Sequence, residues 1–118
     1  MKTENTISAL SFEFSLLIIE LYKKLIKQNE YVLSKQLLRS GTSIGANVEE
    51  ANAAQTKKDL ITKMSIASKE ARESKYWLRL LDKSELVKLD YSIPLEKINH
   101  IINILTKIVK TSQESISK

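Results

Sequence analysis

The most informative stretch of this chain is RSGTSIGANVEEANAAQ, residues 39–55. It contains both glycines of the sequence, Gly41 and Gly45, although a glycine inside a helix costs about 1 kcal/mol relative to alanine. Apolar and small residues recur around them at helical spacing: Leu33, Leu37, Gly41, Ile44, Val48 and Ala51. We therefore predict one helix over residues 32–53, in which the glycines let a neighbouring helix approach closely. The alternative is a break at SGTSIG, which would leave two short helices.

Two further segments have the same periodicity. The first covers residues 6–28, and its apolar surface is broad: Leu10, Phe14, Leu17, Leu21 and Leu25 form one face, widened by Phe12, Ile18, Ile19, Tyr22 and Ile26. The second covers residues 58–86 and has an unbroken heptad seam, made of Leu60, Met64, Ala67, Ala71, Ser74, Leu78 and Leu81. Because the centre of this seam is small, we expect the glycine-bearing helix to lie against it.

A last helix is predicted over residues 93–111, with a seam of Leu95, Ile98, Ile102, Leu105 and Val109. Ser92 is expected to cap its N-terminus, with Pro94 in the first turn, and the polar tail 112–118 is expected to fray. Four amphipathic helices with short connections predict an all-α fold, namely a single-domain antiparallel four-helix bundle with up-down-up-down order.

The composition restricts the chemistry. The 118 residues include no cysteine and a single histidine, His100, so disulfides, thiolate catalysis and a metal site built on a histidine pair within one chain are excluded. We predict no catalytic residue, no metal ligand and no cofactor, and we assign His100 no function. The N-terminus lacks a secretory pattern and no apolar run is long enough to span a membrane, so we expect a cytoplasmic protein with no membrane partner.

The net charge of +5 is concentrated in one segment, because residues 57–88 contain nine basic and five acidic side chains. On a helical wheel the basic residues gather on one side, away from the seam. We call this row, together with a tyrosine within it, the basic stripe: Lys58, Lys69, Arg72, Lys75, Tyr76, Arg79 and Lys83. Such a row attracts phosphate backbones, and Tyr76 could stack on an unpaired base. The alternative is a solvated face with intrahelical ion pairs such as Lys69–Glu73.

Polar residues of the glycine-bearing helix form a ridge along one edge of its apolar face: Gln36, Arg39, Ser43, Asn47 and Glu50. Such a row could belong to an active site, but no nucleophile or metal ligand accompanies it. We favour a hydrogen-bond network that fixes the register of helices or subunits.

Ile66, Trp77 and Leu80 form a second apolar surface beside the heptad seam. If they are exposed they would make an adhesive patch, so together with the broad face of the first helix they are candidates for a subunit interface. Equally, Trp77 could simply cap the bundle core.

The segment LSKQLLRSGTSIGANVEEA, residues 33–51, resembles the signature of the four-helix-bundle proteins encoded in 23S rRNA intervening sequences. The residues that carry the resemblance are Gln36, Arg39, Ser43, Ile44, Asn47, Val48 and Glu50, and the segment KMSIASKEARESKYWLRLL, residues 63–81, resembles the third helix of that family. Two positions depart from the pattern, since Gly45 stands where many members have proline and Ala51 where many have glycine. The resemblance implies an antiparallel four-helix bundle that assembles as a homopentamer. It also relates the chain to basic accessory proteins of diversity-generating retroelements, which bind nucleic acid and a reverse transcriptase.

Two functional hypotheses follow. In the first, the chain is a non-enzymatic homo-oligomer that binds RNA or DNA backbones through the basic stripe, and five copies together would carry about +25. In the second, it is a structural adaptor that binds a protein partner. An enzyme is disfavoured because nucleophile, metal and phosphate-loop signals are missing.

Overall fold

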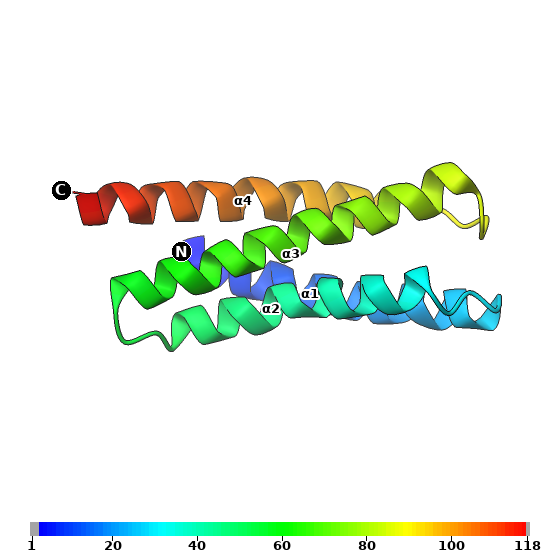
Figure 1. Ribbon diagram of the computed structural model, residues 1–118, viewed down its shortest axis with the longest axis horizontal. Coiled ribbons are helices and arrows are strands. Elements are labelled where there is room, and N and C mark those ends of the chain that lie inside the picture. The colour runs from blue at the N-terminus through cyan, green and yellow to red at the C-terminus, as the bar shows by residue number, and fades with distance from the viewer. Residues whose placement is uncertain (1–2, 118) are drawn as a thin grey trace.

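The computed structural model describes residues 3–117 and has four helices: α1, Thr3–Lys27; α2, Leu33–Asn52; α3, Lys57–Ser84; and α4, Ser92–Ser117. Successive helices run in opposite directions, so that α1 begins and α4 ends towards the end of the bundle that holds the α2–α3 connection (Figure 1). The molecule is an elongated rod of 50 × 24 × 22 Å. The predicted all-α antiparallel four-helix bundle is confirmed.

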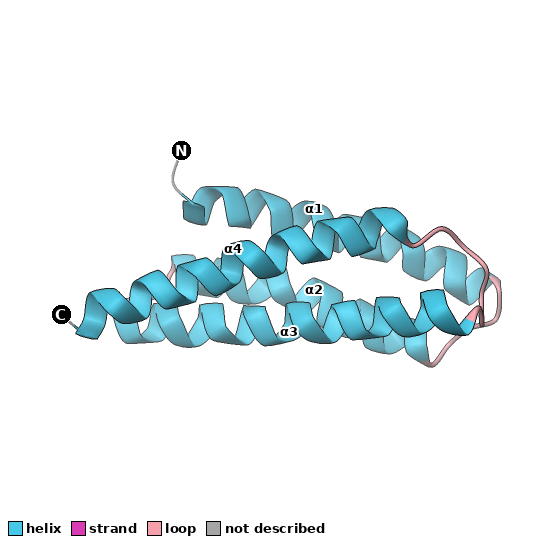
Figure 2. Cartoon of the chain, turned by 90° about the horizontal axis from the view of Figure 1, so that it is seen from above, coloured by secondary structure: helices cyan, strands magenta, loops and turns pink. Residues whose placement is uncertain are grey.

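Each helix packs against its neighbours in sequence, and α4 returns beside α1 (Figure 2). The α2–α3 pair has the most extensive contact and the α1–α4 pair the least. Along the described residues, α1 does not pack against α3, nor α2 against α4. The helices therefore stand at the corners of a square, and each has one side turned to solvent.

The heptad seam of α3 lies in the core as the spacing predicts. Its residues from Met64 to Leu81 are buried, and Leu60 at the start is half-buried. The apolar face of α2 is buried in the same way from Leu37 to Ala51. A helical stripe of this kind gains most of its stability from tertiary burial rather than from intrinsic propensity.

Both glycines lie inside one continuous α2, so the break at SGTSIG does not occur. They face α1. The expectation that the glycine-bearing helix lies against the α3 seam is confirmed, because α2 and α3 have the most extensive contact, but the nearest neighbours of the two glycines are on α1. A Cβ atom on Gly41 would lie 3.0 Å from Ile18, and one on Gly45 would lie 3.4 Å from the carbonyl oxygen of Ser11. Ser40, the residue before Gly41, contacts the α3 seam and accepts a hydrogen bond of 2.9 Å from Ser74.

Helix ends differ from the predicted ones by one to three residues, except at the C-terminus. There α4 continues to Ser117, where we expected an end at Thr111 and a frayed tail over 112–118. No glycine or proline interrupts residues 112–117, and Gln113 lies on the side of α4 that faces α3. Ser92 is the first residue of α4 and not a flanking cap. Its backbone N–H and its hydroxyl both donate to Asp90.

The N-terminus of α2 is capped by a residue that the sequence pattern did not single out. Glu30 accepts hydrogen bonds from the backbone N–H groups of Val32, Leu33 and Ser34, at 3.0, 3.0 and 2.6 Å. Burial alone would raise the pKa of Glu30, but these bonds stabilise the carboxylate and the net pKa lies below its ordinary value.

Candidate nucleic-acid interface

The basic stripe follows the solvent side of α3, from the first turn of the helix to the last. Six of its seven side chains are exposed, and Lys75 is half-buried. On the other side of α3, Glu70, Glu73 and Ser74 contact α2. The stripe is therefore turned away from α2, towards α4 and solvent.

The cations of the stripe are not neutralised by carboxylates. Within residues 6–116, whose side chains the structure describes, the salt bridges use other basic side chains: Lys23, Arg39 and Lys63. The Lys69–Glu73 pair that would make the stripe an ordinary solvated face does not form, because Glu73 binds Arg39 and Trp77 instead. Apart from one donor of Arg72, which bonds to Thr106, the cationic side chains keep their hydrogen-bond donors available to an external anion.

The ridge residue Arg39 explains why the acidic residues of α3 are unavailable to the stripe. It bridges Glu70, with an Nη1–Oε2 distance of 3.0 Å, and Glu73. The hydrogen bond from Trp77 Nε1, at 3.0 Å, is the main cause that lowers the pKa of Glu73, and the contact with Arg39 adds to it. In turn the hydrogen bond to Glu73 raises the pKa of Arg39. One side of α3 is thereby neutralised while the other remains cationic.

The other four ridge residues differ in what their side chains contact. Glu50 forms a salt bridge of 2.7 Å with Lys63 of α3. Ser43 donates to the carbonyl oxygen of Arg39, at 2.6 Å, and Asn47 donates to that of Ser43, at 2.9 Å, so both bond within α2. Gln36 is exposed, and its side chain forms no hydrogen bond with another described residue. The structure thus places two of the five residues, Arg39 and Glu50, across the α2–α3 contact.

The candidate interface residues lie on the α2 side of α3. Ile66 is 37% exposed, and Trp77 and Leu80 are half-buried, with Trp77 packed against the core. The ring of Tyr76 meets that of Trp77 edge to face, at a centroid distance of 5.2 Å, and is itself 53% exposed. Tyr76 belongs to the basic stripe and Trp77 to the apolar surface, so the stripe and the apolar surface meet at this pair of aromatic rings.

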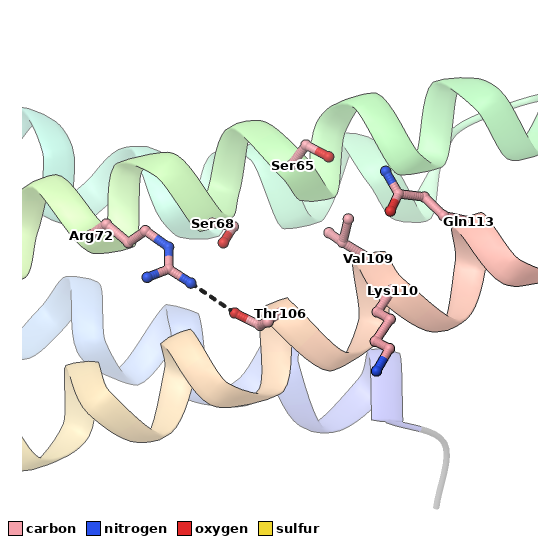
Figure 3. Close-up of a pocket in the computed structure, with 7 residues that line it drawn as sticks. All are labelled: Ser65, Ser68, Arg72, Thr106, Val109, Lys110 and Gln113. Carbon is pink, nitrogen blue, oxygen red and sulfur yellow. Dashed lines mark hydrogen bonds between the residues drawn. The ribbon is translucent and has the colours of Figure 1, made fainter.

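A groove between α3 and α4 extends the stripe onto a second helix (Figure 3). Arg72 reaches across it and donates to Thr106 of α4, at 3.1 Å. Beyond this contact the lining includes Ser65, Ser68 and Lys110, none of which our sequence analysis singled out. The available signal was the spacing of Thr106, Lys110 and Gln113, which lie on one face of α4. Only the pairing of the helices shows that this face meets the stripe.

Residues 6–116, whose side chains the structure describes, contain no group of three histidine, cysteine, aspartate or glutamate side chains placed to hold a metal ion. Nor does any helix among them combine the length and the apolar character needed to cross a bilayer.

Comparisons with known proteins agree with the fold. The family model described as "23S rRNA-intervening sequence protein" matches residues 3–107. Among solved structures, the chain is similar to a protein of unknown function from the S23 ribosomal protein family of Bacteroides thetaiotaomicron VPI-5482. The two share 44% identity and a TM-score of 0.88, over 92% of this chain and 99% of the other. No match is found among curated proteins, and neither match indicates an enzyme family. With most of its length matched, the chain belongs to the 23S rRNA-intervening sequence protein family.

Proposed function

We propose that this protein is a non-enzymatic module that binds the phosphate backbone of RNA or DNA through the basic stripe of α3. The observation that carries the proposal is the separation of charge on this helix. Arg39 occupies the carboxylates of Glu70 and Glu73 on one side, and the lysines and arginines of the other side are left without acidic partners. Such a surface binds by releasing counterions and does not read base sequence.

The test is a charge reversal of three exposed stripe residues whose side chains form no hydrogen bond or ion pair, Lys69, Arg79 and Lys83, each changed to Glu. The matched control reverses the three exposed lysines of α1, Lys23, Lys24 and Lys27, which changes the net charge by the same amount. Binding of labelled oligonucleotides is followed by fluorescence anisotropy across a salt series. Circular dichroism verifies that both variants remain helical.

For the wild type, engagement of about five phosphates predicts a slope of log K against log salt near −3.5 for single strands. The stripe variant is expected to lose most of this slope and at least tenfold in affinity, whereas the α1 control keeps the greater part of both. Equal losses in the two variants would show that net charge, and not the stripe, is responsible. Absence of wild-type binding at low salt would refute the proposal.

Self-assembly forms part of the proposal. Phe12, Leu16 and Ile19 are spaced four and three residues apart on α1 and are 65%, 51% and 37% exposed. They are large apolar side chains on one helical face, beside a hollow of about 300 Å³ between α1 and α2. An exposed apolar face of this kind supports association. The family resemblance extends the proposal to a homopentamer.

A second candidate function, a structural adaptor, rests on the same apolar face and on Ile66, Trp77 and Leu80. In that case the surfaces bind a different protein. Light scattering distinguishes self-assembly through these surfaces from binding of a different protein. An oligomer that dissociates when Phe12 and Leu16 are changed to Ser supports self-assembly. A wild-type protein that is monomeric at micromolar concentration favours the adaptor.

A further inference from the structure

The groove between α3 and α4 is lined by neutral donors and cations and by no carboxylate. It has a volume of about 280 Å³, and its lining consists of Ser65, Ser68, Arg72, Thr106, Val109, Lys110 and Gln113. Figure 3 shows Ser68, Thr106 and the Arg72 guanidinium close to one another where the two helices approach. An anion that enters this groove meets hydroxyl and guanidinium groups and no carboxylate. Lys110 borders the groove with its ammonium group directed away from α3 (Figure 3), and a rotation of its flexible side chain would bring that group to a bound anion.

The two serines of the groove are unusual among the hydroxyls of α3. Serine and threonine inside helices commonly bond back to the preceding turn, and on α3 both Thr62 and Ser74 do so, at 3.0 and 2.9 Å. The hydroxyl groups of Ser65 and Ser68 form no hydrogen bond with any described residue, although both residues are half-buried. Their hydroxyl groups remain free to donate to a ligand in the groove.

The cations of the groove are also available. Arg72 makes one hydrogen bond, to Thr106, which orients the guanidinium and leaves its other donors unused. Lys110 is exposed and has no carboxylate partner among the described residues. A guanidinium held on a hydroxyl keeps its full charge, whereas one held on a carboxylate would be neutralised.

Tyr76 lies one helical turn, about 6 Å, beyond Arg72 on the same side of α3. Its ring is half-exposed and is held against Trp77. Exposed aromatic rings beside a cationic path stack on unpaired bases, which a duplex does not present. The combination of groove and ring therefore favours a single strand.

We propose that the α3–α4 groove holds one phosphate of a single-stranded nucleic acid, bound by Arg72, Lys110 and the hydroxyl groups of Ser65 and Ser68, with a neighbouring base stacked on Tyr76. This inference rests on the proposed function and deepens it, since it names one phosphate position and the strandedness of the ligand. RNA and DNA share this backbone chemistry, and oligonucleotides of both kinds are compared in the test.

The test uses two pairs of variants on the full chain, with single-stranded RNA, single-stranded DNA and duplex DNA as probes. Lys110→Gln removes a groove cation, and its control is Lys97→Gln, an exposed lysine of the same helix that faces the α1 side. The double variant Ser65→Ala/Ser68→Ala removes the free hydroxyls, and its control is Thr62→Ala outside the groove. All these positions are on the surface or half-buried, and circular dichroism verifies that the fold is retained.

Lys110→Gln is expected to weaken single-strand binding about tenfold and to reduce the salt slope by about 0.7, the value for one phosphate contact. The serine variant is expected to lose about three- to tenfold with an unchanged slope, because it removes hydrogen bonds and no charge. The Lys97 and Thr62 controls stay within about twofold of the wild type. Equal effects of Lys110→Gln and Lys97→Gln overturn the groove assignment, even if the stripe variant confirms the proposed function.

Tyr76→Ala tests the stacked base. It is expected to weaken binding of a single-stranded oligonucleotide about tenfold, and to leave binding of an abasic strand with the same backbone unchanged. Equal losses on the two strands, or a wild type that prefers duplex, would overturn the inference of a single-stranded ligand. A wild type that binds none of the probes overturns this inference and the proposed function together.

Discussion

Replacing Gly45 with alanine is expected to stabilise the protein, whereas the same replacement at Gly41 is expected to be neutral or destabilising. Both residues lie within α2, so each substitution gains about 1 kcal/mol of helix propensity. The two sites differ only in what the new methyl group meets on α1. The pair therefore isolates the contact from the propensity.

At Gly45 the added Cβ lies 3.4 Å from the Ser11 carbonyl oxygen and from Ser15 Oγ, which is ordinary van der Waals contact. Most of the propensity gain should survive, giving about 0.5–1 kcal/mol of stabilisation. At Gly41 the Cβ lies 3.0 Å from both Cγ atoms of Ile18, whose side chain is fully buried. Overpacking of such a site costs about 1–3 kcal/mol, so the net change is about 0–2 kcal/mol of destabilisation.

Urea unfolding followed by circular dichroism and by the fluorescence of Trp77, the single tryptophan, measures both variants. The midpoint should rise for Gly45→Ala and stay or fall for Gly41→Ala, with unchanged slopes. In an Ile18→Ala background the clash is removed, so Gly41→Ala should become stabilising there. If Gly41→Ala stabilises the wild type as much as Gly45→Ala does, the close approach of α1 is not what requires glycine.

Three further outcomes follow from the contacts. Glu30→Gln should cost about 1–2 kcal/mol at neutral pH, because it removes the charged cap of α2. The folded pKa of Glu30 lies below 4.5, so this contribution to the free energy of unfolding is complete above pH 4.5 and is lost as the pH falls through the folded pKa. Unfolding measured as a function of pH should therefore show the stabilities of the variant and the wild type converging in acid. A stability difference that stays constant with pH would contradict the cap. Arg39→Ala should lower the free energy of unfolding in urea by about 0.5–1 kcal/mol, since the Arg39 side chain is half-exposed. It should also alter the fluorescence emission of Trp77, because Glu73 binds both side chains, and an unchanged spectrum would count against this Arg39–Glu73–Trp77 network. Deletion of residues 112–118 should reduce the helical dichroism but cost less than about 1 kcal/mol in thermal unfolding, and a larger loss would mean that this turn stabilises the bundle.

The helices and the faces that they bury were predictable from the sequence, because periodicity records which side of a helix avoids water. The heptad seam from Met64 to Leu81 is buried, and the basic stripe is exposed on the other side of the same helix. The tail was not predictable in this way. Residues 112–117 are polar, and whether a polar segment continues a helix depends on what precedes it and what lies beside it.

Spacing along single helices was enough to predict that four amphipathic helices form a bundle and that its cationic residues gather on one face. Which helix meets which face became visible only with the four helices packed together. The packing placed Gly41 against Ile18 of α1 and not against α3, brought Arg39 to Glu73, and set Thr106 beside Arg72. The physical reason is that a helical pattern specifies the direction in which a side chain points, while its partner is chosen by the packing of all four helices together.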